Sequence, residues 1–260
     1  MVTTFDQSKG QLTAQAADKM RGEFGDGGWT LRQKIALVSR VLFDEGHASG
    51  LAGQITVRGE SPNSYFTQRL GLGLDEIAVS NLILVDEDLT VLEGQGMPNP
   101  ANRFHSWIYR ARPDVKCIIH THAPNVSALS MLEIPLVVSH MDTSPLYEDC
   151  ALLPKWPGVP FGNEEGKIIS EALEDKRAIL LAHHGLLVAC PRLEEACHIA
   201  ILFEKAAKLQ LLAMAAGEIQ AIGSAPGREA HNWELGEANV DAEFQYRVRR
   251  ILRAHPDCLD

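Results

Sequence analysis

The sequence predicts a single mixed α/β domain in which helices flank a central sheet. Three observations lead to this prediction. Apolar residues recur at helical spacing over 31–45, short strand-like pieces with a period near two fill 54–92, and residues 193–217 combine high helix propensity with a helical period. No shift in composition divides the 260 residues into two parts, so one domain is the simplest organisation.

The N-terminal part predicts an arm followed by a helix. Residues 1–28 are polar and weakly periodic and end in the glycine-bearing GEFGDGG, so we predict a loosely held arm. Thr30 is placed to cap a helix that begins at Leu31, and Gly46 is placed to end it. One face of this helix carries the apolar residues Leu31, Ile35, Val38 and Leu42.

The middle of the chain predicts an antiparallel sheet and its first helices. Glycine, proline, asparagine and aspartate separate five short strand-like pieces, QITVR, SYFTQ, EIAVS, LILVD and LTVL. A helix is expected over NRFHSWIYRAR and a buried strand over VKCIIHTH. The next segment, PNVSALSML, predicts a short helix with Pro124 in its first turn.

The second half alternates between strands and helices. We expect a strand at PLVVS, a helix at EEGKIISEAL, and two strands, AILLAHH and LLVAC, that are hinged at Gly185. The long helix over 193–217 follows. Pro226 and Gly227 mark a linker before a last helix at DAEFQYRVRRILRA.

Charge and composition exclude several classes of partner. The formal net charge of -10 argues against nucleic acid, whose binding depends on clustered Lys and Arg. No apolar stretch approaches the roughly 20 residues that span a bilayer, and the N-terminus lacks the apolar centre of a signal peptide, so we expect a cytoplasmic protein without a membrane partner. Five scattered cysteines without a Cys-x-x-Cys pair predict neither a disulfide framework nor a thiolate zinc site.

The motif His120-Thr121-His122 predicts half of a metal site. Residues i and i+2 of a strand share a face, so both imidazoles point the same way and Thr121 points opposite. The alternative is a hydrogen-bonded histidine pair at a strand end. A second histidine pair, His183-His184, also ends a buried strand, and one of its members could supply a third ligand. Spacing alone does not choose between these two.

The other histidines are assigned to packing or to the surface. His105 lies among apolar residues of a predicted helix, where a packing role is expected, and His140 follows a predicted strand and could line a pocket. Surface or packing roles are expected for His47, His198, His231 and His255.

The loop GLAGQITVR, residues 50–58, has the character of an anion cradle. Flexible glycines and small polar residues offer backbone N–H groups to a carboxylate or phosphate, with Arg58 as a charged partner. The alternative is a plain hairpin turn. Neither a phosphate-binding nor a dinucleotide fingerprint is present, because the Gly-x-Gly at 71–73 lacks a strand-loop-helix setting.

In this order, GLAGQITVR, HSWIYRARPDVKCIIHTHAPNVSALS and AILLAHHGLLVAC resemble the class II aldolase and adducin family. The resemblance covers residues 29–220, which leaves 221–260 as a C-terminal extension with a terminal helix. It implies a single three-layer α/β/α domain with a central, mainly antiparallel sheet flanked by helices. By the same resemblance, a homo-oligomer, commonly a tetramer, is expected.

The resemblance also implies a ligand set. In enzymes of the family the His-x-His pair and the histidine of an Asn-His-Gly motif bind one divalent metal, which corresponds here to His120, His122 and His184, with His183 in place of the usual asparagine. Zinc is expected first, with manganese, iron or cobalt as alternatives. The sugar-phosphate aldolases have a catalytic glutamate in a Pro-Ser-Ser-Glu segment, and here Ala101 stands in its place. This departure argues against phosphosugar aldol cleavage. The NPANRFHS segment and the GLAGQITVR loop look more like the branch that includes adducin heads and some metal-dependent decarboxylases and oxygenases.

What the resemblance implies for function is a metal-dependent carbon–carbon lyase of the EC 4.1 type, an aldehyde-lyase (aldolase) or a decarboxylase. It would act on a small oxygenated carboxylate or keto substrate through a metal-stabilised enolate. Gly53, Gln54, Thr56 and Arg58 are the predicted substrate-binding residues. The proton donor is not identified, and a metal-bound water, His140 and Tyr147 are the candidates. The alternatives are a non-catalytic, adducin-like interaction module and an Fe(II)-dependent oxygenase.

Overall fold

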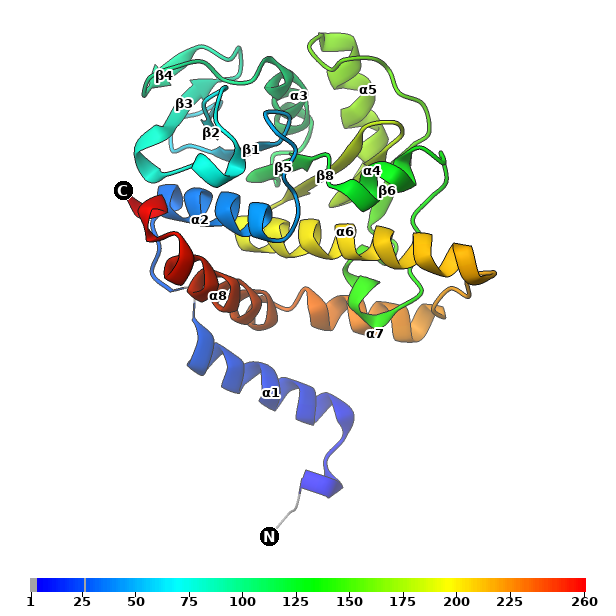
Figure 1. Cartoon of the computed structure of the whole chain (residues 1–260). Coiled ribbons are helices and arrows are strands. Elements are labelled where there is room, and N and C mark those ends of the chain that lie inside the picture. Colours follow the sequence, from blue (N-terminus) through cyan, green and yellow to red (C-terminus); the bar gives the residue numbers. More distant parts are fainter. Residues whose placement is uncertain (1–3, 26) are drawn as a thin grey trace.

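One eight-stranded sheet organises the chain. A computed structural model describes residues 4–25 and 27–260 (Figure 1). The strand order across the sheet is β4-β3-β2-β1-β5-β8-β7-β6. The strands are β1 (Gln54–Arg58), β2 (Ser64–Gln68), β3 (Leu82–Asp86), β4 (Val91–Glu93), β5 (Cys117–Thr121), β6 (Cys150–Leu153), β7 (Ala178–Leu181) and β8 (Gly185–Cys190).

The sheet is antiparallel except at one edge. Only the β6–β7 pair is parallel among the described strands. The strand β5 lies between β1 and β8, with Gln54 opposite His120 and Leu187 opposite His120 on the other side. All five residues of β5 are buried because both faces of this central strand are covered. The predicted central, mainly antiparallel sheet is confirmed.

Helices cover both faces of the sheet, which gives the predicted three-layer α/β/α arrangement (Figure 1). The helices α2 (Leu31–Asp44) and α6 (Leu193–Ala216) pack on one face and share a core with the inward side chains of β1, β5 and β8. A second core lies on the other face under α3 (Arg103–Ala111) and α5 (Asn163–Leu173). Alternate residues of β5 explain this division, since Cys117 and Ile119 belong to the first core and Ile118 belongs to the second.

The C-terminal extension joins the first core. It forms α7 (Ser224–Glu234) and α8 (Glu237–Ala254), and α8 packs against α2 and α6. Phe244, Val248 and Ile251 recur at helical spacing on α8 and are buried in that core. The predicted linker at Pro226 and Gly227 is therefore wrong, because both residues lie in the first turns of α7, where proline is tolerated.

The N-terminal arm contains a helix that the weak periodicity did not predict. Helix α1 (Lys9–Phe24) begins with a capping box between Ser8 and Gln11, and none of its residues is buried. It contacts α8 and lies at the outside of the molecule in Figure 1. Residues 1–3 and 26 of the predicted arm lie outside the described residues. In the described part of the chain, no helix is both long and apolar enough to cross a bilayer.

Two predicted strands take other forms. The segment PLVVS runs along α6, because the Gln210 side chain accepts a hydrogen bond from the Val137 N–H and donates one to the Pro135 carbonyl. The segment EIAVS is split between two 3-10 turns, η2 (Leu74–Glu76) and η3 (Val79–Asn81). The remaining short helices are η1 (Thr4–Asp6), η4 (Pro100–Asn102), α4 (Pro124–Ser130), η5 (Met141–Leu146) and η6 (Pro256–Leu259).

Candidate metal centre

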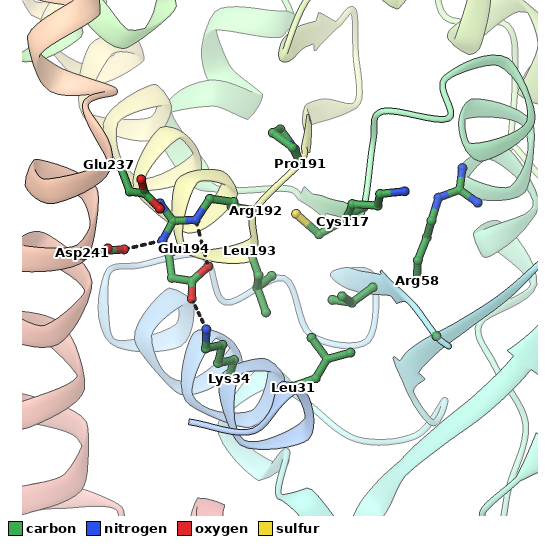
Figure 2. Close-up of a pocket in the computed structure, with 13 residues that line it drawn as sticks. Leu31, Lys34, Arg58, Cys117, Pro191, Arg192, Leu193, Glu194, Glu237 and Asp241 are labelled. Carbon is green, nitrogen blue, oxygen red and sulfur yellow. Dashed lines mark hydrogen bonds and ion pairs between the residues drawn. The ribbon is translucent and has the colours of Figure 1, made fainter. Parts of the chain in front are cut away.

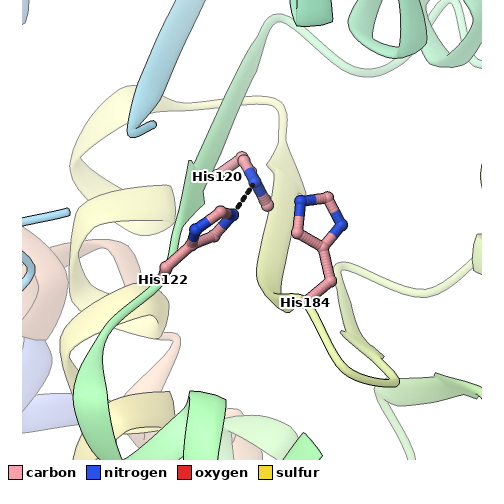
Figure 3. Close-up of side chains that lie close together, drawn as sticks. All are labelled: His120, His122 and His184. Carbon is pink, nitrogen blue, oxygen red and sulfur yellow. Dashed lines mark hydrogen bonds between the residues drawn. The ribbon is translucent and has the colours of Figure 1, made fainter. Parts of the chain in front are cut away.

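Two of the predicted ligands come from the C-terminal end of β5. His120 lies on the strand and His122 lies just beyond it, and both imidazoles point to the same side (Figure 3). Their Nε2 atoms are 3.1 Å apart, so one nitrogen donates a hydrogen bond to the other. The His-x-His spacing has thus produced the geometry expected from a strand.

The third histidine arrives from the tight turn between β7 and β8. His183 has a positive φ of 55°, which turns the chain so that His184 points back towards β5 (Figure 3). The His184 ring centroid lies 4.7 Å from that of His120 and 4.7 Å from that of His122. His183 is exposed and pairs with Glu133 instead, at 2.9 Å. The structure thus brings His184, and not its neighbour, to the histidine pair.

The donor set fits a divalent metal. One ring nitrogen from each of His120, His122 and His184 lies within 4.8 Å of the others. Nitrogen ligands of a tetrahedral zinc site lie about 3.3 Å apart, given Zn–N bonds of about 2.0–2.1 Å, so small ring rotations would close the set. The Nδ1–H of His120 donates to the Leu186 carbonyl at 2.7 Å, which leaves Nε2 as the lone-pair donor. His122 and His184 are half-buried, so the cluster is accessible from solvent.

All three imidazoles are held in the neutral form that a metal requires. Burial, and next the neighbouring His184 and His122, bring the pKa of His120 well below its usual range. Burial also lowers the pKa of His122. Burial and the proximity of His122 lower the pKa of His184 to about 4. At neutral pH the cluster therefore offers lone pairs rather than protons.

Two further histidines are fully buried beside this site. His47 shares a hydrogen bond between its Nδ1 and the Thr121 hydroxyl, at 2.8 Å, and His105 shares one between its Nδ1 and the Thr56 hydroxyl, also at 2.8 Å. Burial lowers the pKa of His47 to about 4 and that of His105 to about 3. The expected packing role of His105 agrees with its edge-to-face contact with Phe104, whose ring also meets His120.

These buried histidines predict a loss of stability in acid. Their folded pKa values lie below the unfolded value of about 6.5, so between those values the unfolded chain binds protons that the folded chain does not. Stability therefore falls as the pH drops through 6.5. Between pH 7.5 and pH 5, His47 and His105 should each remove about 2 kcal/mol from the free energy of unfolding.

Chemical denaturation of the metal-free protein at both pH values measures this loss. A His47→Gln variant removes one titrating imidazole, so its loss between the two pH values should be smaller than that of the wild type by about 2 kcal/mol. Equal losses in variant and wild type would show that His47 is not held neutral by burial.

The predicted substrate loop is divided by the fold. Gly53 and Gln54 lie at the end of β1 next to the histidines, where Gln54 is the cross-strand partner of His120 and shares its face of the sheet. The Gln54 side chain is buried, its Nε2 donates to the Ala52 carbonyl, and its Oε1 has no hydrogen-bond partner among the described residues. A buried amide oxygen of this kind, next to the histidines, is suited to accept a hydrogen bond from a donor group of a bound ligand.

Thr56 and Arg58 are not brought to the cluster. The Thr56 hydroxyl is buried between His105 and Tyr109 and ties α3 to the sheet. Arg58 lies at the opposite end of β1, about 13 Å along the strand from Gln54 at roughly 3.3 Å per residue. Its guanidinium donates to the carbonyls of Val115 and Tyr109. The structure therefore does not bring these two predicted substrate-binding residues to the histidine cluster, because residues 54–58 form a strand rather than a cradle.

Arg58 lines a separate cavity at that far end of the sheet (Figure 2). The cavity has a volume of ≈ 560 Å³, and its wall carries an ion-pair network in which Glu194 joins Lys34 at 2.6 Å and Asp241 pairs with Arg192. The strand order and direction separate it from the histidines by the length of β1, β5 and β8. It is therefore not part of the metal site.

The two proton-donor candidates also lie outside the cluster. His140 is exposed and caps η5, where its Nδ1 accepts from the Asp142 N–H. The Tyr147 ring packs against Gly227 of α7. Within the described residues, neither forms a hydrogen bond or ring contact with the three histidines. Ala101 is buried in η4 and brings no carboxylate.

The groups that hydrogen-bond to the backbone just after β5 are not evident from the sequence. The His122 N–H donates to the Ser49 hydroxyl at 2.8 Å. The Glu204 carboxylate accepts from the N–H groups of Asn125 and Val126, at 2.9 Å each, and so caps α4 directly after the histidine pair. A buried acid on an apolar helix was the one available signal for Glu204. Ser49 gave no signal, because its partner lies 73 positions away.

Comparisons with known proteins show the family of the chain. Residues 33–211 match the family model described as Class II Aldolase and Adducin N-terminal domain. The chain is 34% identical over 196 residues to decarboxylase NovR of Streptomyces niveus, and the matched region covers 74% of this chain and 72% of that protein. It is equally similar, at 34% over 196 residues and 74% and 70% coverage, to the 4-hydroxy-3-prenylphenylpyruvate oxygenase/4-hydroxy-3-prenylbenzoate synthase of Streptomyces roseochromogenus subsp. oscitans.

A solved structure extends the similarity to nearly the whole fold. An L-fuculose 1-phosphate aldolase from Glaciozyma antarctica PI12 superposes with a TM-score of 0.80 and is 30% identical, over 88% of this chain and 92% of that one. The family model, the two relatives and this structure point to the same assignment. The chain belongs to the class II aldolase and adducin family.

Proposed function

We propose that the protein is a metal-dependent carbon–carbon lyase, an aldolase or decarboxylase, that acts on a small oxygenated carboxylate or keto acid. The observation that carries the proposal is that His120, His122 and His184, all neutral, converge at one end of the central strands β5 and β8. His122 and His184 are half-buried there. Three imidazoles with an open side are typical of a catalytic metal site. Relatives named as a decarboxylase and as aldolases support the reaction class.

The metal, with zinc as the first expectation and manganese, iron or cobalt as alternatives, would supply Lewis-acid polarisation of substrate oxygens and charge stabilisation. The chain's own residues would orient the substrate. Gln54 is the cross-strand partner of His120, and its Oε1, which has no hydrogen-bond partner among the described residues, would accept a hydrogen bond from a hydroxyl. Gly53 lets the backbone lie close to the substrate. Of the four predicted substrate residues, these two remain proposals.

The missing carboxylate favours decarboxylation over aldol cleavage of a phosphosugar. Ala101 is apolar and buried, so no side-chain acid in the described part of the chain joins the histidine cluster. A decarboxylation releases carbon dioxide without a base that first removes a hydroxyl proton. It therefore needs fewer protein acid/base groups than a retro-aldol step.

A second candidate function is Fe(II)-dependent oxygenation. The observation that favours it is the similarity to the relative from Streptomyces roseochromogenus subsp. oscitans, which is named as an oxygenase and a synthase. Against it stands the donor set, because non-haem Fe(II) oxygenases commonly use two histidines and one carboxylate. The cluster here has three histidines and no carboxylate.

Turnover assays separate the candidates. Protein loaded with Zn²⁺, Mn²⁺, Co²⁺ or Fe²⁺ would be incubated without oxygen with a panel of small keto and hydroxy-keto carboxylates, and carbon dioxide and aldehydes would be measured. The lyase proposal predicts product without oxygen and none from a His184→Ala variant. Product that forms only with Fe²⁺ and oxygen would support the oxygenase instead. A protein that binds no metal and turns over nothing would fit an adducin-like interaction module.

Assembly and location stay predictions from the sequence. A homo-oligomer and a cytoplasmic location are expected by resemblance and composition. Size-exclusion chromatography with light scattering measures the first. A small-molecule substrate is the partner that the family and the open histidine cluster support.

A further inference from the structure

We infer that two residues of the segment His47–Ser49, namely Ser49 and His47, position the histidine ligands of the metal site. The inference rests on the proposed metal site and goes beyond it, since neither residue is a metal ligand. His120 is held within the strand β5, whereas His122 lies past the last residue of that strand. The hydrogen bonds of β5 therefore do not fix its orientation, and contacts from neighbouring segments must do so.

Ser49 fixes the backbone of His122. Its hydroxyl accepts from the His122 N–H at 2.8 Å and donates to the His47 carbonyl at 3.1 Å. The hydroxyl thus bridges the loop that follows α2 to the first residue beyond β5. Because the Cα–Cβ direction of His122 follows from its backbone, this bond sets the direction in which the imidazole leaves the chain.

His47 fixes the residue between the two ligands. Its imidazole is fully buried, and its Nδ1 lies 2.8 Å from the Thr121 hydroxyl. Its Nε2 has no hydrogen-bond partner among the described residues, so the Thr121 bond is the one polar contact of this ring there. Thr121 points away from His120 and His122, so His47 holds β5 from the face opposite the metal.

The other side of the same residues is closed by β8. A Cβ on Gly185 would lie 2.5 Å from the Thr121 carbonyl oxygen and 3.3 Å from the His122 Cα. The backbone of β8 therefore lies in contact with the end of β5. The His47–Ser49 segment forms two hydrogen bonds with the same end of β5. Metal–ligand distances in a well-formed site vary by only about 0.2 Å. The contact with β8 and the hydrogen bonds from the His47–Ser49 segment should therefore both affect the affinity for the metal.

The segment also connects the ligands to the proposed substrate loop. Ser49 pairs with Leu51 in an isolated bridge, and the chain then runs through Gly53 to Gln54, the cross-strand partner of His120. One continuous stretch from 47 to 54 therefore contacts both metal-bearing residues of β5 and the buried amide beside them. This explains why two polar residues occupy a loop that closes on the strand end.

Cobalt binding tests the inference without any substrate. Co²⁺ titrated into metal-free protein gives visible absorption whose intensity and position report coordination geometry, and competition with a chelator gives the dissociation constant. Ser49→Ala is expected to weaken Co²⁺ binding by about 10-fold to 100-fold and to change the spectrum. Ser49→Thr retains the hydroxyl and should restore both.

The matched control is Ser64→Ala. Ser64 is buried, whereas Ser49 is half-buried, and its hydroxyl also donates to a backbone carbonyl in a turn, that of Ser61 at 2.7 Å, but it lies away from the histidines. This variant should bind Co²⁺ as the wild type does. If it weakened binding as much as Ser49→Ala, the effect would reflect general loss of stability and the inference would be overturned.

Thr121→Val provides a second test should Ser49→Ala not fold. Valine has the shape of threonine but cannot bond His47, so binding should again weaken about 10-fold or more, and Thr121→Ser should restore it. A wild-type protein that binds no Co²⁺ would overturn the proposed metal site together with this inference. Wild-type binding that Ser49→Ala and Thr121→Val leave within twofold, with unchanged spectra, would overturn the inference alone.

Discussion

Replacing His122 with alanine should lower the metal content of the reconstituted protein from about one ion per chain to below one tenth. The variant keeps two imidazoles, those of His120 and His184, and leaves the third ligand position to water. Catalytic zinc sites need three protein ligands to hold the ion through dialysis. Elemental analysis by mass spectrometry after dialysis measures the result, and lyase activity should fall to background with the metal.

His183→Ala is the matched control for this experiment. His183 precedes a ligand directly in the sequence, but its ring is exposed and pairs with Glu133. The control should therefore keep its full metal content. A His122→Ala protein that retains the ion, or a His183→Ala protein that loses it, would contradict the ligand assignment.

Gly185→Ala should destabilise the fold and disturb the metal site at once. The new Cβ would lie 2.5 Å from the Thr121 carbonyl oxygen and 3.1 Å from the His122 ring, and the first of these is a backbone atom that cannot rotate away. Overpacking of this kind costs typically about 1–3 kcal/mol. Urea denaturation of the metal-free protein should show a loss in that range, and metal affinity should fall as β5 and β8 separate.

Gly22→Ala is the control for that substitution. Gly22 lies within α1, and a Cβ there would meet nothing within 4 Å. This variant should be neutral or slightly more stable, because alanine favours a helix over glycine by up to about 1 kcal/mol. If Gly185→Ala were as stable as this control, the close approach of β8 to β5 would be wrong.

Features with a strong local period could be predicted from the sequence. The strand over VKCIIHTH, the helix over 193–217 and the helix after Thr30 follow from apolar spacing and capping residues, and the structure confirms them. The geometry of the His-x-His pair follows from the two-residue period of a strand, in which alternate side chains share a face. Spacing alone does not choose between His183 and His184, whereas the family resemblance implies His184. In the structure the positive φ of His183 turns the chain so that His184 faces β5.

Features that depend on a distant partner could not be predicted. The segment PLVVS has the composition of a strand, yet Gln210 draws its backbone polar groups to α6. Arg58 was assigned to an anion cradle because glycines precede it, but the strand carries its side chain to the carbonyls of Val115 and Tyr109. Tertiary contacts outweighed local propensity in both cases.

The central claim is that His120, His122 and His184 bind one divalent metal, and anomalous X-ray scattering tests it most directly. Crystals of zinc-loaded protein would be measured above and below the zinc absorption edge. We predict one peak, about 2.0–2.1 Å from Nε2 of His120 and of His122 and from one ring nitrogen of His184. A map without this peak, in which the His120 and His122 rings remain hydrogen-bonded to each other, would contradict the claim.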